Sequence, residues 1–315
     1  MSRYPDIRHV REIKTESLLE NNVLFITMCS CRYDTAEKAN IPAIRKLGEL
    51  RKAYTHGDYT VSAHKSFFNG RLPVVMDDPK LPFYSEAVSQ LWRINSGKPH
   101  EADKKRFPII LEENNIIEGY RKQDYKIIGI GGVSQFNEGS ILRSYFNKGE
   151  FSYYGTDMTE EPLEPRKKEQ FPFNHLDNLL ETIHNYDKWF LFINCSEAHY
   201  PYDIGNGLPD DVLKYFDYIK LRLNLRDNKD EQTNAGKKMD SKLHSLQTRA
   251  LESIDNGIKK LLYNLPHNRD ILTVICGDHG ENFGEIFAGK QRWGHLFPSK
   301  EVMEVPLVIG QMYWR

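Results

Sequence analysis

The sequence predicts an α/β fold, in which a mostly parallel sheet carries helices on both faces. Apolar, β-branched runs of strand length recur along the 315 residues, and stretches with apolar residues at helical spacing precede most of them. The runs are almost continuously apolar, which is typical of parallel strands that helices bury on both sides. Ligands of such folds bind beyond the carboxyl ends of the strands, so polar residues just after each strand are the candidates for chemistry.

The individual elements follow from these patterns. The first strand covers 22–28, where NVLFITM leads into a Cys-Ser-Cys segment. A helix is expected over 41–55, because four aliphatic residues from Ile41 to Leu50 recur at helical spacing. Further helices are expected over 114–125, 176–186 and 241–266. Further strands are expected over 126–133, 188–197, the apolar part of 270–281 and 305–310.

Composition is typical of a soluble globular protein. Hydrophobic residues make up 39% and charged residues 28%, and the formal net charge is −1. This balance gives no indication of binding to nucleic acid or to an anionic membrane. The chain has no apolar run of the roughly 18–20 residues that span a bilayer, and its N-terminus lacks the apolar core of a secretory signal. We expect a single domain over 1–315, with a polar surface loop around 225–242.

The cysteines point to a reducing compartment. The chain has four cysteines without CxxC spacing, and three of them lie in or at the ends of apolar runs. This pattern favours free thiols over disulfides. We therefore expect a cytoplasmic protein.

Reactive side chains gather after the predicted strands. They are Cys29, then Thr60, Ser62 and His64 before a helix, then Glu197 and His199, and finally Asp278, His279 and His295. Each group alone has an ordinary explanation, because Ser and Thr before a helix usually cap it and a Glu-x-His pattern is usually on the surface. Convergence on one edge of a parallel sheet favours a divalent metal site instead. A hydroxyl at a helix N-terminus also suits an anionic substrate.

Several motifs, in their order along the chain, resemble the alkaline phosphatase superfamily. The segments are NVLFIT, AYTHGDYTVSAHKSFFNGRLP, HYPYD, GDHGENFGE, and GH followed by VPLVI. The chain is most similar to the compact, sulfatase-like hydrolases of that superfamily, over most of residues 22–310. The resemblance implies one sulfatase-like catalytic domain that acts on a small anionic ester.

The resemblance also assigns roles to residues. The nucleophile of the family lies ten residues before the glycine that ends its helix, and counting back from Gly70 gives Thr60. Asp278 and His279 match the metal-binding Asp-His pair. Three further residues match positions that hold a second metal or contact the substrate and its leaving group. These are Glu197, His199 and His295.

The sulfatase signature itself is absent. Formylglycine sulfatases carry Cys or Ser at the nucleophile position, followed by a proline and an arginine. Here Ser62 stands at the proline position and His64 at the arginine position. We expect His64 to orient Thr60 or to contact the substrate, and Ser62 is the alternative nucleophile.

Cys29 stands where the family places an acidic metal ligand. Thiolate is a good ligand for zinc and a poor one for magnesium or calcium. We expect one or two Zn²⁺ ions, with Mn²⁺ as the alternative, in a phosphoester hydrolase or transferase. The expected ligands are Cys29, Thr60, Asp278, His279, His295 and Glu197. The alternatives are a sulfatase without formylglycine and a non-catalytic binding protein whose metal site is damaged at Cys29.

Overall fold

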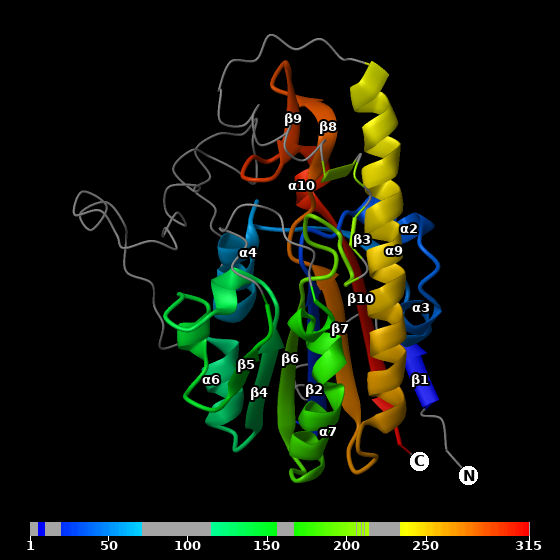
Figure 1. The fold of residues 1–315 in the computed structure, drawn as a ribbon. Coiled ribbons are helices and arrows are strands. Elements are labelled where there is room, and N and C mark those ends of the chain that lie inside the picture. Colours follow the sequence, from blue (N-terminus) through cyan, green and yellow to red (C-terminus); the bar gives the residue numbers. More distant parts are fainter. Residues whose placement is uncertain are drawn as a thin grey trace, which may run out of the picture.

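The computed structural model describes residues 6–9, 20–70, 115–155, 167–205, 207–208, 210, 212–213 and 234–314. In this part of the chain, an eight-stranded sheet lies between helices on both of its faces (Figure 1). Its strands are β1 (Asp6–His9), β2 (Asn22–Met28), β3 (Arg51–Tyr54), β4 (Lys126–Gly131), β5 (Phe151–Tyr153), β6 (Trp189–Cys195), β7 (Ile271–Gly277) and β10 (Glu304–Tyr313). The α-helices are α2 (Tyr33–Lys38), α3 (Pro42–Leu47), α4 (Thr60–Asn69), α6 (Ile116–Arg121), α7 (Leu176–His184), α9 (Asn234–Asn264) and α10 (Lys300–Met303).

The centre of the sheet is parallel and one edge is antiparallel. The strand order is β1-β10-β7-β2-β6-β4-β5, and β3 also pairs with β10. From β7 to β5 every neighbouring pair is parallel, whereas β10 runs antiparallel to β7, β1 and β3. The predicted α/β fold with a mostly parallel sheet is therefore confirmed.

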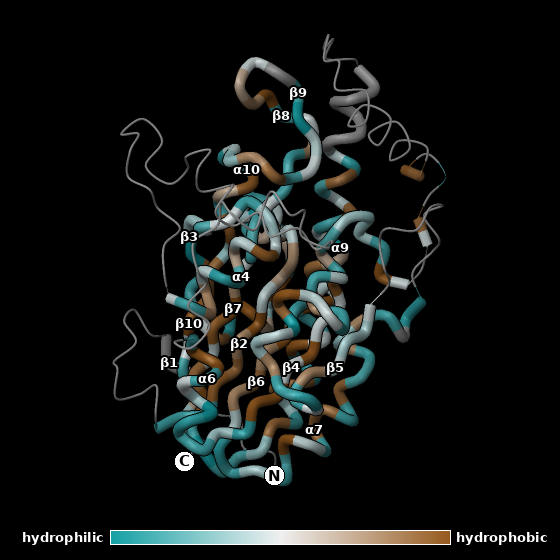
Figure 2. The backbone as a smooth tube through the Cα atoms, turned by 90° about the vertical axis from the view of Figure 1, so that its left-hand side faces the viewer, coloured by the Kyte–Doolittle hydropathy of each residue, from teal (hydrophilic) through white to brown (hydrophobic). Residues whose placement is uncertain are grey.

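Two apolar cores flank the sheet. One core packs α2, α3, α7 and α9 against one face, and the other packs α4 and α6 against the opposite face. All seven residues of β6 are buried, as expected for a strand that is covered on both sides. Figure 2 shows hydrophobic residues concentrated along the central strands.

The helix predicted over 41–55 is wrong in its second half. Helix α3 ends at Leu47, and β3 then pairs with β10. A Cβ at Gly48 would lie 2.5 Å from the backbone oxygen of Ile309, so only glycine allows this close approach to β10. Leu50 continues the helical spacing of aliphatic residues beyond Gly48, which is why the sequence predicted a longer helix. The pairing of β3 with β10 forms a strand there instead.

The polar loop predicted around 225–242 is also corrected in part. Residues 234–242 form the first turns of α9, and 225–233 lie outside the described residues. Adding turns to an existing helix costs little once a packed segment has nucleated it. The packed segment begins near Leu243, which is 2% exposed.

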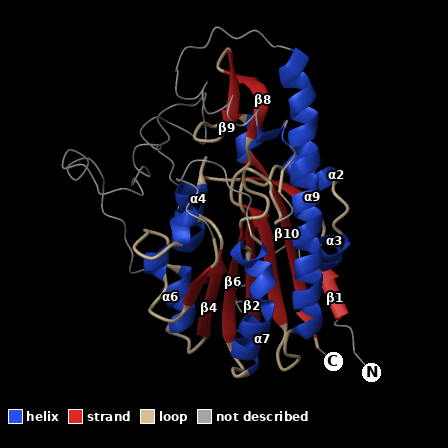
Figure 3. Cartoon of the chain, in the orientation of Figure 1, coloured by secondary structure: helices blue, strands red, loops and turns tan. Residues whose placement is uncertain are grey.

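A small hairpin, β8 (Asn282–Phe287) and β9 (Lys290–Gly294), was not predicted. Figure 3 shows it beyond the end of the central sheet, next to α9. None of the described helices combines the length and the apolar composition that crossing a bilayer requires. All four cysteines are buried and free of disulfides.

Candidate active site

The residues that follow the adjacent strands β6, β2 and β7 lie side by side, because these strands end in register. Met28 of β2 is in register with Cys195 of β6 and with Gly277 of β7. The residues that come next, Cys29 and Asp278, therefore lie close together beyond the carboxyl ends of the central strands. Cys29 is fixed there by a hydrogen bond of 3.0 Å from its backbone nitrogen to the Cys195 oxygen.

Cys29, Asp278 and His279 form a compact group of metal-ligating side chains. Their ligand atoms all lie within 4.8 Å of one another, and each residue is 0% exposed. Cys31 is not part of this group, because its side chain lies in the core on the opposite face of the sheet. The structure thus brings together three of the ligands that the sequence predicted.

One carboxylate oxygen of Asp278 is fixed by the backbone and the other faces the group. Oδ1 accepts hydrogen bonds from the backbone nitrogens of Ser30, at 3.0 Å, and His279, at 2.8 Å. Oδ2 is buried without a hydrogen bond to any of the described residues and lies 3.7 Å from Nε2 of His279. A buried acceptor without a donor is costly, and a cation would satisfy it.

His279 presents an unprotonated nitrogen to the same space. Its Nδ1 donates to the backbone oxygen of Gly280 at 2.8 Å, because a carbonyl oxygen can only accept. Burial, followed by the charge of His295, holds the pKa of His279 well below its usual range. Nε2 therefore carries a lone pair. The loop packs tightly here, since a Cβ at Gly280 would lie 2.0 Å from the Glu301 oxygen.

Thr60 is the first residue of α4, and its hydroxyl joins the group. Oγ1 lies 3.5 Å from Sγ of Cys29 and 3.4 Å from Nε2 of His279. The Tyr59 side chain makes no capping hydrogen bond at this helix start, and helix N-termini favour anions. Ser62, the alternative nucleophile, instead donates its hydroxyl to the backbone oxygen of Tyr59 at 2.9 Å.

His64 lies beneath Thr60 and uses both of its ring nitrogens inside the protein. Nδ1 donates to the Thr60 backbone oxygen at 2.7 Å, and Nε2 accepts from the Thr27 hydroxyl at 3.0 Å. Asn194 donates in turn to that hydroxyl. The imidazole is surrounded by the rings of Phe67, Phe68, Phe136 and Phe192. This geometry suits the expected role of orienting Thr60 and leaves no nitrogen for a substrate.

His199 and His295 lie next to the metal-ligating group but outside it. The ring of His295 is 4.5 Å from that of His279 and 6.0 Å from that of His199, measured between centroids. Both residues are half-buried. Glu197, which follows β6 and is 4% exposed, also stays outside the group of ligand atoms found among the described residues.

Two residues to which the sequence assigned no role support the site. Glu281, inside the GDHGE motif, is 5% exposed and contacts His295. Arg32 is 3% exposed, binds both carboxylate oxygens of Asp34 at 2.8 Å, and contacts Glu285. Asp34 is therefore paired with Arg32. The only sequence signal for these residues was their closeness to the motifs.

The side chains present fit a divalent metal. Asp278 Oδ2, His279 Nε2 and Cys29 Sγ supply the oxygen, nitrogen and sulfur donors that zinc prefers. Burial and then the charge of Asp278 raise the pKa of the Cys29 thiol well above its usual range. A cation bound to a thiol reverses this by favouring the thiolate. Cys29 can thus serve as a ligand when a metal occupies the group.

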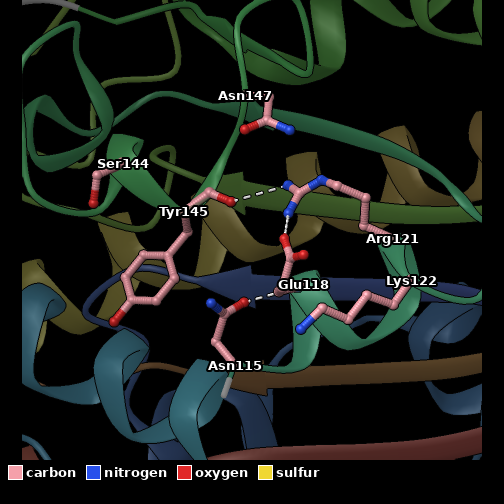
Figure 4. Close-up of a pocket in the computed structure, with 7 residues that line it drawn as sticks. All are labelled: Asn115, Glu118, Arg121, Lys122, Ser144, Tyr145 and Asn147. Atoms are coloured by element: carbon pink, nitrogen blue, oxygen red, sulfur yellow. Dashed lines mark hydrogen bonds and ion pairs between the residues drawn. The ribbon is translucent and has the colours of Figure 1, made fainter. Parts of the chain in front are cut away.

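A separate polar cavity of about 360 Å³ lies at the other end of α4 (Figure 4). Asn69, the last residue of α4, donates to the hydroxyl of Tyr145 in its wall. The cationic side chain of Arg121 is paired there with Glu118 and Glu150. This cavity shares no lining residue with the metal-ligating group.

Comparisons with known proteins identify the family of the chain. A family model described as Sulfatase matches residues 34–310. No curated protein matches the sequence. The putative sulfatase yidJ from Bacteroides fragilis is a similar solved structure, with a TM-score of 0.56 and 16% identity, covering 97% of this chain and 70% of that chain.

Two further solved structures are similar. The phosphonate monoester hydrolase SpPMH from Silicibacter pomeroyi has a TM-score of 0.56 and 16% identity, covering 92% of this chain and 68% of that chain. The C-terminal periplasmic domain of EcEptC from Escherichia coli, in complex with Zn, has a TM-score of 0.55 and 10% identity. The match covers 99% of this chain and 76% of that chain. A Vibrio parahaemolyticus protein of the alkaline phosphatase superfamily has a TM-score of 0.48, and this chain spans 60% of it.

At these identities the solved structures establish a shared fold. The family model matches far more than half of the chain. The chain therefore belongs to the Sulfatase family.

Proposed function

We propose that the protein is a metal-dependent hydrolase or transferase of small phosphoesters that uses Thr60 as its nucleophile. The observation that carries this proposal is the position of the Thr60 hydroxyl, 3.5 Å from Cys29 Sγ and 3.4 Å from His279 Nε2. Similar structures that are named as a phosphonate monoester hydrolase and as a complex with Zn support a metal-dependent enzyme of phosphorus esters.

Cys29, Asp278 and His279 would hold the metal, most simply Zn²⁺, with Mn²⁺ as the alternative. A divalent cation in this position lowers the pKa of a neighbouring hydroxyl and offsets the charge of the phosphoryl oxygens. The start of α4 adds backbone N–H groups that favour the same anion. Glu197, His199 and His295 are proposed to serve a second metal or the leaving group.

In the proposed reaction, Thr60 Oγ1 releases its proton to solvent and bonds to phosphorus while the bond from phosphorus to the leaving oxygen breaks. His295 or His199 supplies a proton to that leaving oxygen. The resulting phosphothreonine is then attacked by water in a hydrolase or by an acceptor hydroxyl in a transferase. His64 holds the backbone of Thr60 in place throughout, through its hydrogen bond of 2.7 Å.

The test is turnover of p-nitrophenyl phosphate, bis(p-nitrophenyl) phosphate and p-nitrophenyl sulfate by wild type and three variants. Thr60→Ala should lose about 10³-fold or more in kcat while remaining folded, and Thr60→Ser should keep part of the activity. Ser62→Ala is the matched control and should stay close to wild type. Full activity of Thr60→Ala would exclude Thr60 as the nucleophile.

Cys29 supports one competing function. A thiol in the place of an acidic ligand favours a non-catalytic binding protein that retains metal poorly. Turnover of none of the three esters, together with no bound metal, would favour that function. Turnover of the sulfate ester alone would instead indicate a sulfatase that works without formylglycine.

We also infer a cytoplasmic location and no nucleic-acid or membrane partner. The four buried free cysteines and the net charge of −1 support these inferences.

A further inference from the structure

One buried carboxylate, that of Glu281, joins three loops of the site. Its Oε1 lies 3.3 Å from Nδ1 of His295, which follows β9. Its Oε2 accepts a hydrogen bond from the hydroxyl of Tyr202, which lies in the loop after β6. Glu281 itself lies between β7 and β8, two residues after His279. The loops after three separate strands thus share this side chain.

The hydrogen bonds determine which nitrogen of His295 carries a proton. Both carboxylate oxygens of Glu281 face hydrogen-bonding groups, because Oε2 accepts from the Tyr202 hydroxyl and Oε1 lies 3.3 Å from Nδ1 of His295. An ionised carboxylate can only accept hydrogen bonds, so Nδ1 of His295 must be the donor. Nε2 is then the nitrogen that remains for a substrate or a cation, as in other carboxylate–histidine pairs.

Tyr202 holds Glu281 from the other side and also belongs to the turn of His199. The Tyr202 side chain is buried, with 3% exposure, and its ring packs edge-on against Phe283. Its backbone nitrogen donates to the His199 oxygen at 2.9 Å. Displacing Tyr202 would therefore loosen both His199 and the carboxylate that His295 contacts.

We infer that Glu281 is a positioning residue, which fixes the ring orientation and tautomer of His295, and that Tyr202 fixes Glu281. The His295 ring is 4.5 Å from the ring of His279, so this orientation places Nε2 beside the metal-ligating group. Nε2 is a ligand or proton acceptor in the neutral ring and a proton donor in the imidazolium. The effect on turnover rests on the proposed function, whereas the effect on the tautomer does not.

The tautomer can be measured directly in the full chain as purified. Long-range ¹H–¹⁵N spectra of histidine-labelled protein, recorded at alkaline pH, distinguish Nδ1–H from Nε2–H imidazoles. The His295 signal is identified by its loss in His295→Gln. Wild type should show the Nδ1–H form at His295. Glu281→Met, which has similar volume and no acceptor, should lose that preference, and Glu281→Gln, which keeps one acceptor, should retain it.

Turnover of bis(p-nitrophenyl) phosphate gives the second readout. Glu281→Met should lose about 10–100-fold in kcat/KM, and Glu281→Gln and Tyr202→Phe should lose less. The matched control is Tyr125→Phe, which removes a buried tyrosine hydroxyl that donates to the Asn21 oxygen at 2.9 Å away from the site. Tyr125→Phe should keep wild-type turnover.

The two claims fail in different ways. An Nε2–H tautomer at His295 in wild type, or an unchanged tautomer in Glu281→Met, would overturn the positioning role whatever the activity. If wild type turned over no ester while Glu281→Met still shifted the tautomer, the positioning role would stand and the proposed function would fail.

Discussion

The thiol of Cys29 and the hydroxyl of Thr60 lie 3.5 Å apart, although the two residues are 31 positions apart in the sequence. One follows β2 and the other begins α4. The proposed nucleophile therefore lies beside a soft ligand in a buried site. Thiolate sulfur prefers zinc to magnesium, so the proposed Cys29 ligand would favour zinc.

Replacing Cys29 with aspartate should change the metal preference. A carboxylate is a hard oxygen ligand, so Cys29→Asp should bind Mn²⁺ better relative to Zn²⁺ than wild type does. Competition between the two ions, followed by elemental analysis, measures the ratio. Wild type loaded with Co²⁺ should also show a thiolate charge-transfer band that Cys29→Asp lacks. Equal Zn²⁺/Mn²⁺ ratios in the two proteins would mean that Cys29 is not a ligand.

The stability of the metal-free protein should fall as the pH drops below about 6.5, the ordinary pKa of histidine. Burial lowers the folded-state pKa of both His64 and His279, so the unfolded chain binds protons first as the pH falls. The stability that each neutral histidine contributes is fully present above its unfolded-state pKa and is lost as the pH falls below that value. Each can add a slope of up to about 1.4 kcal/mol per pH unit.

His64→Asn isolates one of these contributions. The asparagine amide can still donate to the Thr60 oxygen, but it does not titrate. Denaturant unfolding between about pH 5 and pH 7 should show a smaller pH slope in His64→Asn than in wild type. Burial lowers the pKa of His295, but Glu281 raises it by more, so His295 changes the pH slope of stability in the opposite direction. This effect is the same in both proteins. Identical slopes would mean that His64 is not held neutral in the folded state.

Arg32 should be important for stability. Its guanidinium contacts Asp34, Glu285 and the backbone oxygen of Glu281, and Arg32→Met would remove all three contacts. We expect a loss of about 2 kcal/mol in the free energy of unfolding, since Asp34 remains partly solvated. Arg45→Met, at an exposed arginine bound to the Glu37 backbone oxygen, is the control. Equal losses in both variants would contradict this account of Arg32.

The sequence was sufficient to predict five strands, β2, β4, β6, β7 and β10, and the convergence of the residues that follow β2, β6 and β7, but not β1, β3, β5 or the β8–β9 hairpin. Continuous apolar runs are a local signal, and parallel pairing then places Cys29 and Asp278 together without further information. Glu281 escaped prediction because its partners lie 14 and 79 positions away and nothing local distinguishes it from a surface carboxylate. The end of α3 at Leu47 escaped for a similar reason, since it depends on contact between Gly48 and β10.

The most direct test of the central claim is elemental analysis of purified wild type beside Cys29→Ser, with zinc offered to both. The account predicts about one or two zinc ions per chain in wild type, since sites of this donor type hold one metal per group, and less in the variant. Zinc at the same level in both proteins would remove Cys29 from the site. No metal in either protein would contradict a metal-dependent enzyme and leave the binding protein as the better account.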